Sequence, residues 1–181
     1  MDYGTAEDRE LVTAATSGDT AAFEALVRRH TRAVYAHALR FFGDPGPADD
    51  VTQEVFVKVY RSLSSFDDRS RFSTWLYRVT RNACLDEVRA GRRRPVPVDV
   101  LENTAVVSDF SDEVALTEAV EHAMRALPPE DRDALSAVAL FGLSYVEAAE
   151  ALQAPVGTVK SRVFRARRTL AATLGIGPGG A

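Results

Sequence analysis

Apolar residues recur at spacings of three and four along most of this chain of 181 residues, and no segment alternates as a β-strand would. This period places apolar side chains along one face of an α-helix. The clearest stripe consists of Phe23, Val27, His30, Val34, Ala38 and Phe41. The chain is therefore predicted to be all-α.

Glycine and proline divide the pattern into separate helices. A first helix is expected over residues 7–16, and a second from residue 19 or 20 to the breaking segment GDPGP, residues 43–47. A third begins near Pro47, and a fourth covers residues 72–90 with Gly91 as its cap. The core stripes of the last two are predicted at Val51, Val55, Val59, Leu63, Phe72, Leu76, Val79 and Ala83.

A stretch without helical period follows the fourth helix. Residues 95–110 contain two prolines, and the six acids between Pro95 and Val120 are accompanied by no base. Such a composition predicts an extended linker. We therefore expect two small helical domains, residues 1–94 and 111–174, joined by an acidic linker at 95–110 and followed by a flexible tail at 175–181.

The second domain shows the pattern of a helix-turn-helix. Ser144 and Glu147 have the spacing of a capping box, which starts a short helix, and the turn QAP leads to a second helix at Val156. Ala148 and Ala149 are small enough for two helices to cross closely. The predicted core side of the last helix is Val159, Val163, Ala166, Leu170 and Leu174.

The last helix is basic on its outward side. Residues 156–168 hold five basic residues and no acid, although the chain has a net charge of −4. Arginine and lysine bind phosphates or the acceptor edge of guanine, and a hydroxyl can do either. Phe164 either touches a thymine methyl group or packs on the neighbouring helix. The residues predicted to contact DNA are Thr158, Lys160, Ser161, Arg162, Phe164, Arg165 and Arg168.

The residues give no evidence for a metal site, a cofactor site, a signal peptide or a membrane helix. Cys84 is the only cysteine, and the three histidines have no partners at metal-ligand spacing, so we expect neither a metal nor a cofactor. The acidic N-terminus is unlike a signal peptide. No apolar run approaches the roughly 20 residues of a membrane helix, so we expect a cytoplasmic protein without membrane insertion.

Three segments resemble characteristic regions of bacterial sigma factors. DDVTQEVFVKVYRSL, residues 49–63, is similar to region 2.2, and FSTWLYRVTRNACLDEVRAGRRR, residues 72–94, to regions 2.3–2.4. LSYVEAAEALQAPVGTVKSRVFRARRTL, residues 143–170, is similar to region 4.2. Their order and length match the extracytoplasmic-function (ECF) group, which has only domains sigma-2 and sigma-4 and a linker. The resemblance covers residues 21–174.

The resemblance implies a promoter-specificity subunit of RNA polymerase and no catalytic residues. The sigma-2-like helical bundle would bind core RNA polymerase, with the third helix on the clamp helices of the β′ subunit and the β subunit as a further contact. The acidic linker would pass through the active-site and RNA-exit channel, or else be a solvated spacer. The expected docking residues are Asp50, Gln53, Glu54, Val57, Lys58 and Arg61.

The resemblance also assigns the two DNA surfaces. The sigma-4-like helix-turn-helix would recognise the −35 element, and the fourth helix would bind the −10 element where DNA opens. Trp75 is either a core residue or a DNA wedge. An anti-sigma factor is a common partner in the group, although no residue here identifies one. The −10 candidates are Trp75, Tyr77, Arg78, Arg81, Asn82, Arg89, Arg92 and Arg93.

Two other classes of function fit the residues less well. A stand-alone helix-turn-helix regulator would explain the basic helix but would have no use for the polar face between Asp50 and Arg61. An enzyme would need a phosphate-binding glycine loop, a metal cluster or a paired nucleophile and base, and the sequence shows none of these. Binding to core RNA polymerase separates the first alternative from a sigma factor.

Overall fold

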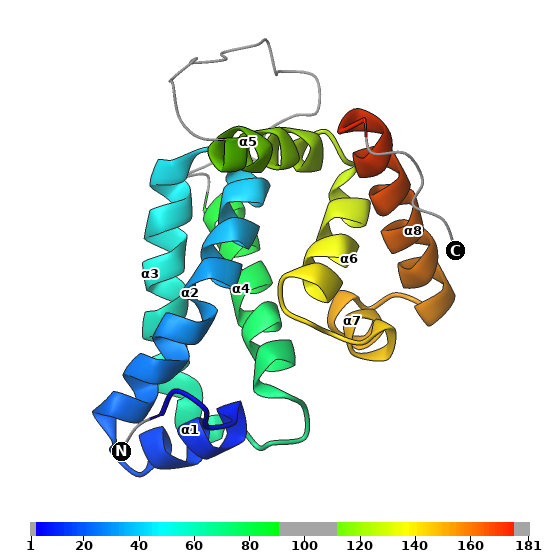
Figure 1. Cartoon of the computed structure of the whole chain (residues 1–181). Coiled ribbons are helices and arrows are strands. Elements are labelled where there is room, and N and C mark those ends of the chain that lie inside the picture. Colours follow the sequence, from blue (N-terminus) through cyan, green and yellow to red (C-terminus); the bar gives the residue numbers. More distant parts are fainter. Residues whose placement is uncertain (1–2, 91–111, 176–181) are drawn as a thin grey trace.

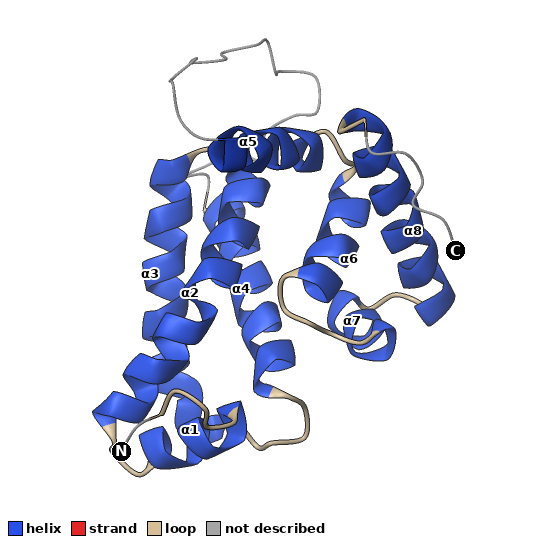
Figure 2. Ribbon diagram, viewed as in Figure 1, coloured by secondary structure: helices blue, strands red, loops and turns tan. Residues whose placement is uncertain are grey.

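The structure, a computed structural model, describes residues 3–90 and 112–175, which form helices joined by turns (Figure 2). The prediction of an all-α fold is confirmed. We call α1–α4 the N-terminal group and α5–α8 the C-terminal group. The elements are α1 (Asp8–Thr16), α2 (Thr20–Phe42), α3 (Pro45–Ser62), the 3-10 turn η1 (Leu63–Ser65), α4 (Phe72–Arg89), α5 (Asp112–Arg125), α6 (Pro129–Ala139), α7 (Tyr145–Leu152) and α8 (Val156–Thr173).

The segment GDPGP both ends α2 and starts α3. Gly43 adopts the left-handed conformation, with φ of 69°, and closes α2. The side chain of Asp44 then accepts a hydrogen bond from the Gly46 N–H, and Pro45 takes the first position of α3. The third helix therefore begins two residues before the predicted Pro47, because a capped proline starts a helix as readily as it breaks one.

The predicted core is confirmed in α3 and only in part in α2. All four stripe residues of α3 and η1 are buried, from Val51 to Leu63. In α2, Val34 and Ala38 are buried, but the rest of the stripe is half-buried, and its deeper positions include Leu26 and His37. The stripe was misplaced because α2 packs against α1, α3 and α4 at once, which buries more than one side of it.

The helix-turn-helix is present as predicted. The Glu147 N–H donates to Ser144 Oγ at 3.2 Å, and the Ser144 N–H donates to Glu147 Oε2 at 2.8 Å, which completes the capping box. Gln153 is left-handed and ends α7. Ala148 and Ala149 of α7 and the residues Val159, Val163 and Ala166 of α8 are buried, so the two helices pack closely.

The two groups pack against each other. Figure 1 shows α6 and α7 between α4 and α8, and α5 contacts both α2 and α8. The sequence predicted two domains but not this contact. Several predicted features lie outside the described residues: the linker at 95–110, the cap Gly91, the arginines Arg92 and Arg93, and the tail from residue 176.

A buried histidine lies in this contact. His37 on α2 packs edge-on against Tyr77 of α4 and Phe141 of the C-terminal group, with ring centroids 5.5 and 6.0 Å away. Neither of its ring nitrogens has a hydrogen-bond partner in the described parts of the chain. Burial lowers the pKa of His37 to about 4. Arg40, Arg81 and Arg132 add to this effect, and Asp133 opposes it.

We therefore predict that acid destabilises the fold through His37. The unfolded state, with a histidine pKa of 6.5, binds a proton that the folded state takes up only near pH 4. The contribution of the neutral His37 to the free energy of unfolding is fully present above about pH 6.5. It decreases as the pH falls towards 4, by roughly 3 kcal/mol in all. Urea unfolding at several pH values should show a flatter profile for His37→Leu. The exposed His122→Gln is the control, and an unchanged profile in His37→Leu contradicts the assignment.

Candidate nucleic-acid and polymerase interfaces

The outer face of α8 is open to solvent. Thr158, Lys160, Ser161 and Arg168 are exposed, and Arg162 is half-buried. Phe164 is 66% exposed, so it does not pack on the neighbouring helix. The Ser161 hydroxyl donates to the Gly157 carbonyl at 2.9 Å, which leaves its lone pairs available. This face presents cations, a hydroxyl and one aromatic ring to a partner, as a major-groove surface requires.

Arg165 differs from the other predicted DNA contacts of α8. Its Nε and Nη2 donate to the two carboxylate oxygens of Asp131 at 3.0 and 2.7 Å. Asp131 is buried at the start of α6, and this hydrogen bond raises the pKa of Arg165. The guanidinium thus ties α8 to α6. The helical wheel placed Arg165 correctly on the outer arc but could not show that a carboxylate from another helix engages it.

The predicted docking face of α3 is an arc that is exposed except at Glu54 and Lys58, which are half-buried. Gln53 and Arg61 are exposed, and Val57 is 48% exposed. Glu54 pairs with Lys58 one turn later, at 2.8 Å, and Lys58 also approaches Asp86 of α4 at 3.7 Å.

Sequence reasoning missed one member of this arc. Tyr60 is 63% exposed and packs edge-on against Phe23, with ring centroids 5.0 Å apart. Tyr60 follows Val57 by three residues and Gln53 by seven, and residues at these spacings lie on the same face of a helix. This spacing could have identified Tyr60 from the sequence. An exposed aromatic ring beside an exposed valine gives the arc an apolar centre.

The aromatic and amide candidates on α4 have different surroundings. Trp75 is half-buried and belongs to a cluster with Phe66 and Phe72, at centroid distances of 5.5 and 5.8 Å. It is therefore neither fully in the core nor fully open to DNA. Asn82 and Arg89 are exposed, and Arg89 pairs with Asp86 at 3.3 Å. These two side chains remain accessible to a nucleic acid.

The other candidates on α4 face the C-terminal group, which corrects the expectation for Tyr77. The Tyr77 ring is fully buried, and its hydroxyl donates to the Asp133 carbonyl at 3.2 Å. Burial raises the pKa of Tyr77. The ring cannot stack on a base in this conformation, because α6 covers it. Arg81 pairs with Asp133 at 3.2 Å and Arg78 approaches Glu150 at 3.7 Å.

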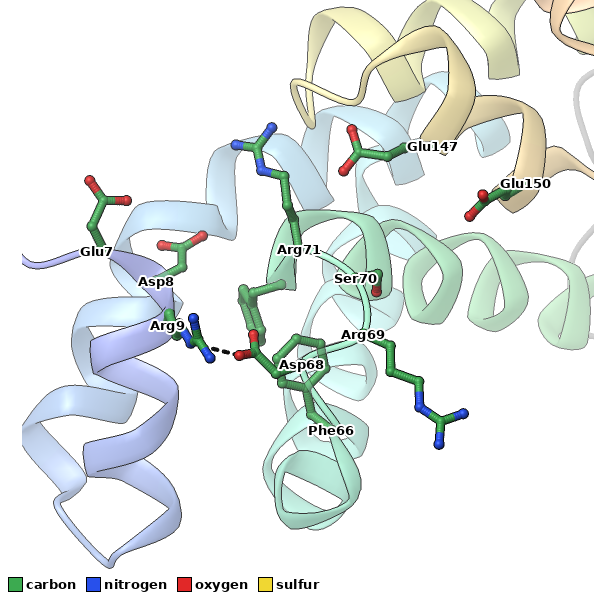
Figure 3. A pocket seen from close by; sticks show the side chains of 11 residues that line it. Glu7, Asp8, Arg9, Phe66, Asp68, Arg69, Ser70, Arg71, Glu147 and Glu150 are labelled. Carbon is green, nitrogen blue, oxygen red and sulfur yellow. Dashed lines mark ion pairs between the residues drawn. The ribbon is translucent and has the colours of Figure 1, made fainter.

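A groove of about 650 Å³ lies between α1, the loop before α4 and α7 (Figure 3). Arg9 Nε pairs with Asp68 Oδ2 at 2.6 Å and joins α1 to this loop. Glu147 and Glu150 of α7 line the opposite wall. Sequence reasoning did not identify this groove, because its walls come from distant segments.

Glu147 is held in its charged form at the edge of the groove. Burial opposes ionisation, but hydrogen bonds from Ser144 and Thr74 and the charge of Arg71 lower the pKa of Glu147. In the described ranges, no group of histidine, cysteine or carboxylate side chains is arranged to hold a metal ion. None of the helices described is long and apolar enough to cross a membrane.

An exposed basic helix in a helix-turn-helix and a separate polar arc are features that suit a DNA-binding protein with a second macromolecular partner. Comparison with known families makes the class specific. Residues 26–94 match the model of Sigma-70 region 2, and residues 117–170 match Sigma-70, region 4. Both matches follow the order in which the two groups occur in the structure.

Individual proteins agree with this match. The ECF RNA polymerase sigma factor SigM of Mycobacterium tuberculosis is 39% identical over 168 residues, covering 93% of this chain and 85% of SigM. The structure of CnrH in complex with the cytosolic domain of CnrY has a TM-score of 0.67 and 30% identity, covering 94% of this chain and 98% of CnrH.

A second solved structure is also similar. It is the sigma factor RpoE of Bartonella quintana in complex with the anti-sigma factor NepR, with a TM-score of 0.64, 25% identity and coverage of 86% of this chain and 98% of RpoE. The chain belongs to the ECF group of the sigma-70 family of RNA polymerase sigma factors. Proteins of this family are initiation factors and not enzymes.

Arg165 and Arg168 allow a matched test of the contact between α8 and α6. Arg165→Ala should lower the melting temperature, because it leaves the buried Asp131 carboxylate without its partner. Arg168→Ala removes an exposed arginine without such a contact in the described ranges and should change the free energy of unfolding by less than about 0.5 kcal/mol. Equal melting temperatures for the two variants would show that the pair does not hold α8.

Proposed function

We propose that this sigma factor binds core RNA polymerase through the exposed arc of α3 and places two DNA surfaces, α4 and α8, on the −10 and −35 elements. The observation that carries the proposal is the arc itself, with its apolar centre at Val57 and Tyr60. A regulator that acted on DNA alone would have no use for it. Charged residues around an apolar centre suit a docking surface, since complementary charge sets specificity and association rate.

In this proposal, α8 reads duplex DNA at the −35 element. Its exposed cations would fix the helix on phosphates, and Lys160, Ser161 or Phe164 would meet base edges or a thymine methyl group. Asp131 takes the Nε–H and one Nη2–H of Arg165, so Arg165 would support the helix and donate to DNA with its other Nη2–H and its two Nη1–H. Recognition would then depend chiefly on the other residues of this face.

We place α4 at the −10 element, where the strands separate. Single-stranded bases are held by stacking and by hydrogen bonds to their edges, at about 1–3 kcal/mol for each stacked base. The half-buried Trp75 would offer its exposed ring edge, and the exposed Asn82 its amide. The arginines from Arg78 to Arg93 would hold phosphates.

The remaining partners follow from the same proposal. Residues 1–94 and 111–174 would be the two working domains, and the acidic linker would lie in the basic channel of the polymerase. RpoE of Bartonella quintana binds an anti-sigma factor, and we propose a regulator of this kind here. The chain would act in the cytoplasm, where the polymerase and the chromosome are.

Transcription in vitro tests the function directly. The purified chain is added to core RNA polymerase on fragments of genomic DNA, and the transcripts are sequenced. Initiation at a defined set of sites, absent without the chain, supports the proposal and reveals both promoter elements. No promoter-dependent transcript with active core polymerase would overturn it.

Glu54 and Glu24 provide a matched test of the docking face. Each is a glutamate near a basic residue one turn later, Lys58 and Arg28 respectively, but only Glu54 lies on the α3 arc. We predict that Glu54→Lys weakens assembly with core polymerase at least about tenfold, whereas Glu24→Lys does not. Native gel titration measures assembly, and circular dichroism checks the fold. Equal assembly by both variants would exclude this face.

Lys160 tests the recognition helix. Lys160→Ala should weaken binding to the selected −35 sequence by about 1–3 kcal/mol if the ammonium group contacts a base. If Lys160 contacts a base, the loss of affinity should be much smaller on a scrambled duplex. If it contacts a phosphate, the loss should be equal on the −35 duplex and the scrambled duplex. Fluorescence anisotropy measures both affinities. No loss on either duplex would remove Lys160 from the interface.

A further inference from the structure

One arginine of the basic face of α8 is held by a carboxylate that solvent barely reaches. Asp131 on α6 is 4% exposed, whereas the side chain of Arg165 is 60% exposed. Arg165 Nε and Nη2 donate to Asp131 Oδ2 and Oδ1 at 3.0 and 2.7 Å. The pair therefore joins a hidden acceptor on α6 to a guanidinium that remains open on the outer face of α8.

The contact uses one edge of the guanidinium and leaves another edge intact. The group is planar and carries five N–H donors in a fixed fork. Asp131 takes the Nε–H and the neighbouring Nη2–H. One N–H of Nη1 and the second N–H of Nη2 remain side by side at the end of the fork, where they point in parallel. A partner with two neighbouring acceptors can bind this end edge without displacing Asp131.

Asp131 occupies a position that holds this geometry still. It lies in the first turn of α6, where the helix dipole favours a carboxylate, and its N–H donates to the Pro128 carbonyl at 3.0 Å. The helix α6 packs against α8 (Figure 1), whose Val163 and Ala166 are buried. The guanidinium is therefore oriented before a partner binds, and less side-chain freedom is lost on binding.

The free edge of Arg165 suits guanine better than it suits phosphate. Guanine presents O6 and N7 as neighbouring acceptors in the major groove, and arginine binds both with two parallel N–H groups. The Asp131 carboxylate offsets the charge of Arg165, which weakens its attraction to phosphate but leaves the direction of its N–H groups unchanged. Exposed Arg168 forms no ion pair within the described ranges, so it keeps its full charge for phosphate.

We propose that Asp131 is a positioning residue for −35 recognition, which directs the free edge of Arg165 at one guanine. The inference rests on the proposed function, in which α8 reads the −35 element. Discrimination at this base pair then depends on a residue of α6 that is too buried to touch DNA itself. The other exposed residues of α8 read the remaining base pairs.

Base-pair replacement in the selected −35 duplex tests the role of Arg165. Each base pair is replaced in turn, and fluorescence anisotropy gives the ratio of affinities for the original and the altered duplex. The full chain should bind at least about tenfold more weakly when one particular G·C pair is replaced, as the loss of one bidentate contact predicts. Arg165→Ala should be indifferent to that pair and keep the other preferences. An equal loss by Arg165→Ala on every duplex would indicate a phosphate contact or a purely structural role, and would overturn the proposal.

Asp131→Asn and Glu130→Gln form a matched pair of variants. Both remove one negative charge from the first turn of α6, but only Asp131 holds Arg165, since Glu130 is exposed. The new amide replaces one acceptor oxygen by an NH2 group, which cannot accept from the guanidinium. Asp131→Asn should lower discrimination at the same G·C pair about fivefold, a typical coupling between residues in contact, without weaker binding to a scrambled duplex. Glu130→Gln should discriminate as the wild-type chain does.

A double variant shows whether the two residues act as one. Asp131→Asn combined with Arg165→Ala should discriminate no less at this pair than Arg165→Ala alone, because Asp131 acts only through Arg165. Each readout is a ratio of two affinities of one variant, so a fraction of unfolded chain lowers both affinities equally and cancels. If Asp131 served stability alone, Asp131→Asn would leave every ratio unchanged, which would contradict the proposal.

The outcomes separate this inference from the proposed function. If the wild-type chain shows no preference at any base pair of the −35 duplex, α8 does not read sequence and both proposals fail. If the wild-type chain discriminates but Asp131→Asn keeps full discrimination at every pair, the positioning proposal is wrong and the function proposed for α8 stands.

Discussion

The arrangement of the molecule depends on one short segment of α6 that meets α4. Asp133 receives the Tyr77 hydroxyl on its backbone carbonyl and the Arg81 guanidinium on its carboxylate. The Tyr77 ring lies against His37 and Phe141, so this contact closes an apolar cluster to which α2, α4 and the C-terminal group each contribute. Because buried polar groups need partners, this register of α6 on α4 satisfies Tyr77 where a shifted one would not.

The ion pairs of this contact add specificity more than strength. Ion pairs in partly buried sites gain little net free energy, because desolvation offsets the attraction between the charges. They mainly select one arrangement over others. The apolar part of the contact includes the rings of His37, Tyr77 and Phe141, and the buried apolar residues of both groups belong to one core cluster.

Sequence patterns succeeded where one local cause determines the structure. The capping box at Ser144 and Glu147, the stripe from Val51 to Leu63 and the buried side of α8 all depend on neighbours within a few turns. The outer arcs of α3 and α8 followed from the same periodicity. The family resemblance added the identity of the partners, which periodicity could not supply.

The errors occurred where distant segments meet. Tyr77 was expected to contact DNA because it is an aromatic residue in the segment that resembles regions 2.3–2.4, and Arg165 was expected to contact DNA because it lies on the basic arc, while its partner on α6 was not foreseen. Their positions within the helices were correct, but Asp133 and Asp131 come from a helix that begins about fifty residues after Tyr77 and about thirty-five before Arg165. The sequence alone determined the helices, their caps and their basic and acidic faces, because these follow from spacing along one chain. Only the tertiary structure decided which charged face meets another face of the same molecule, because that depends on how separate helices pack.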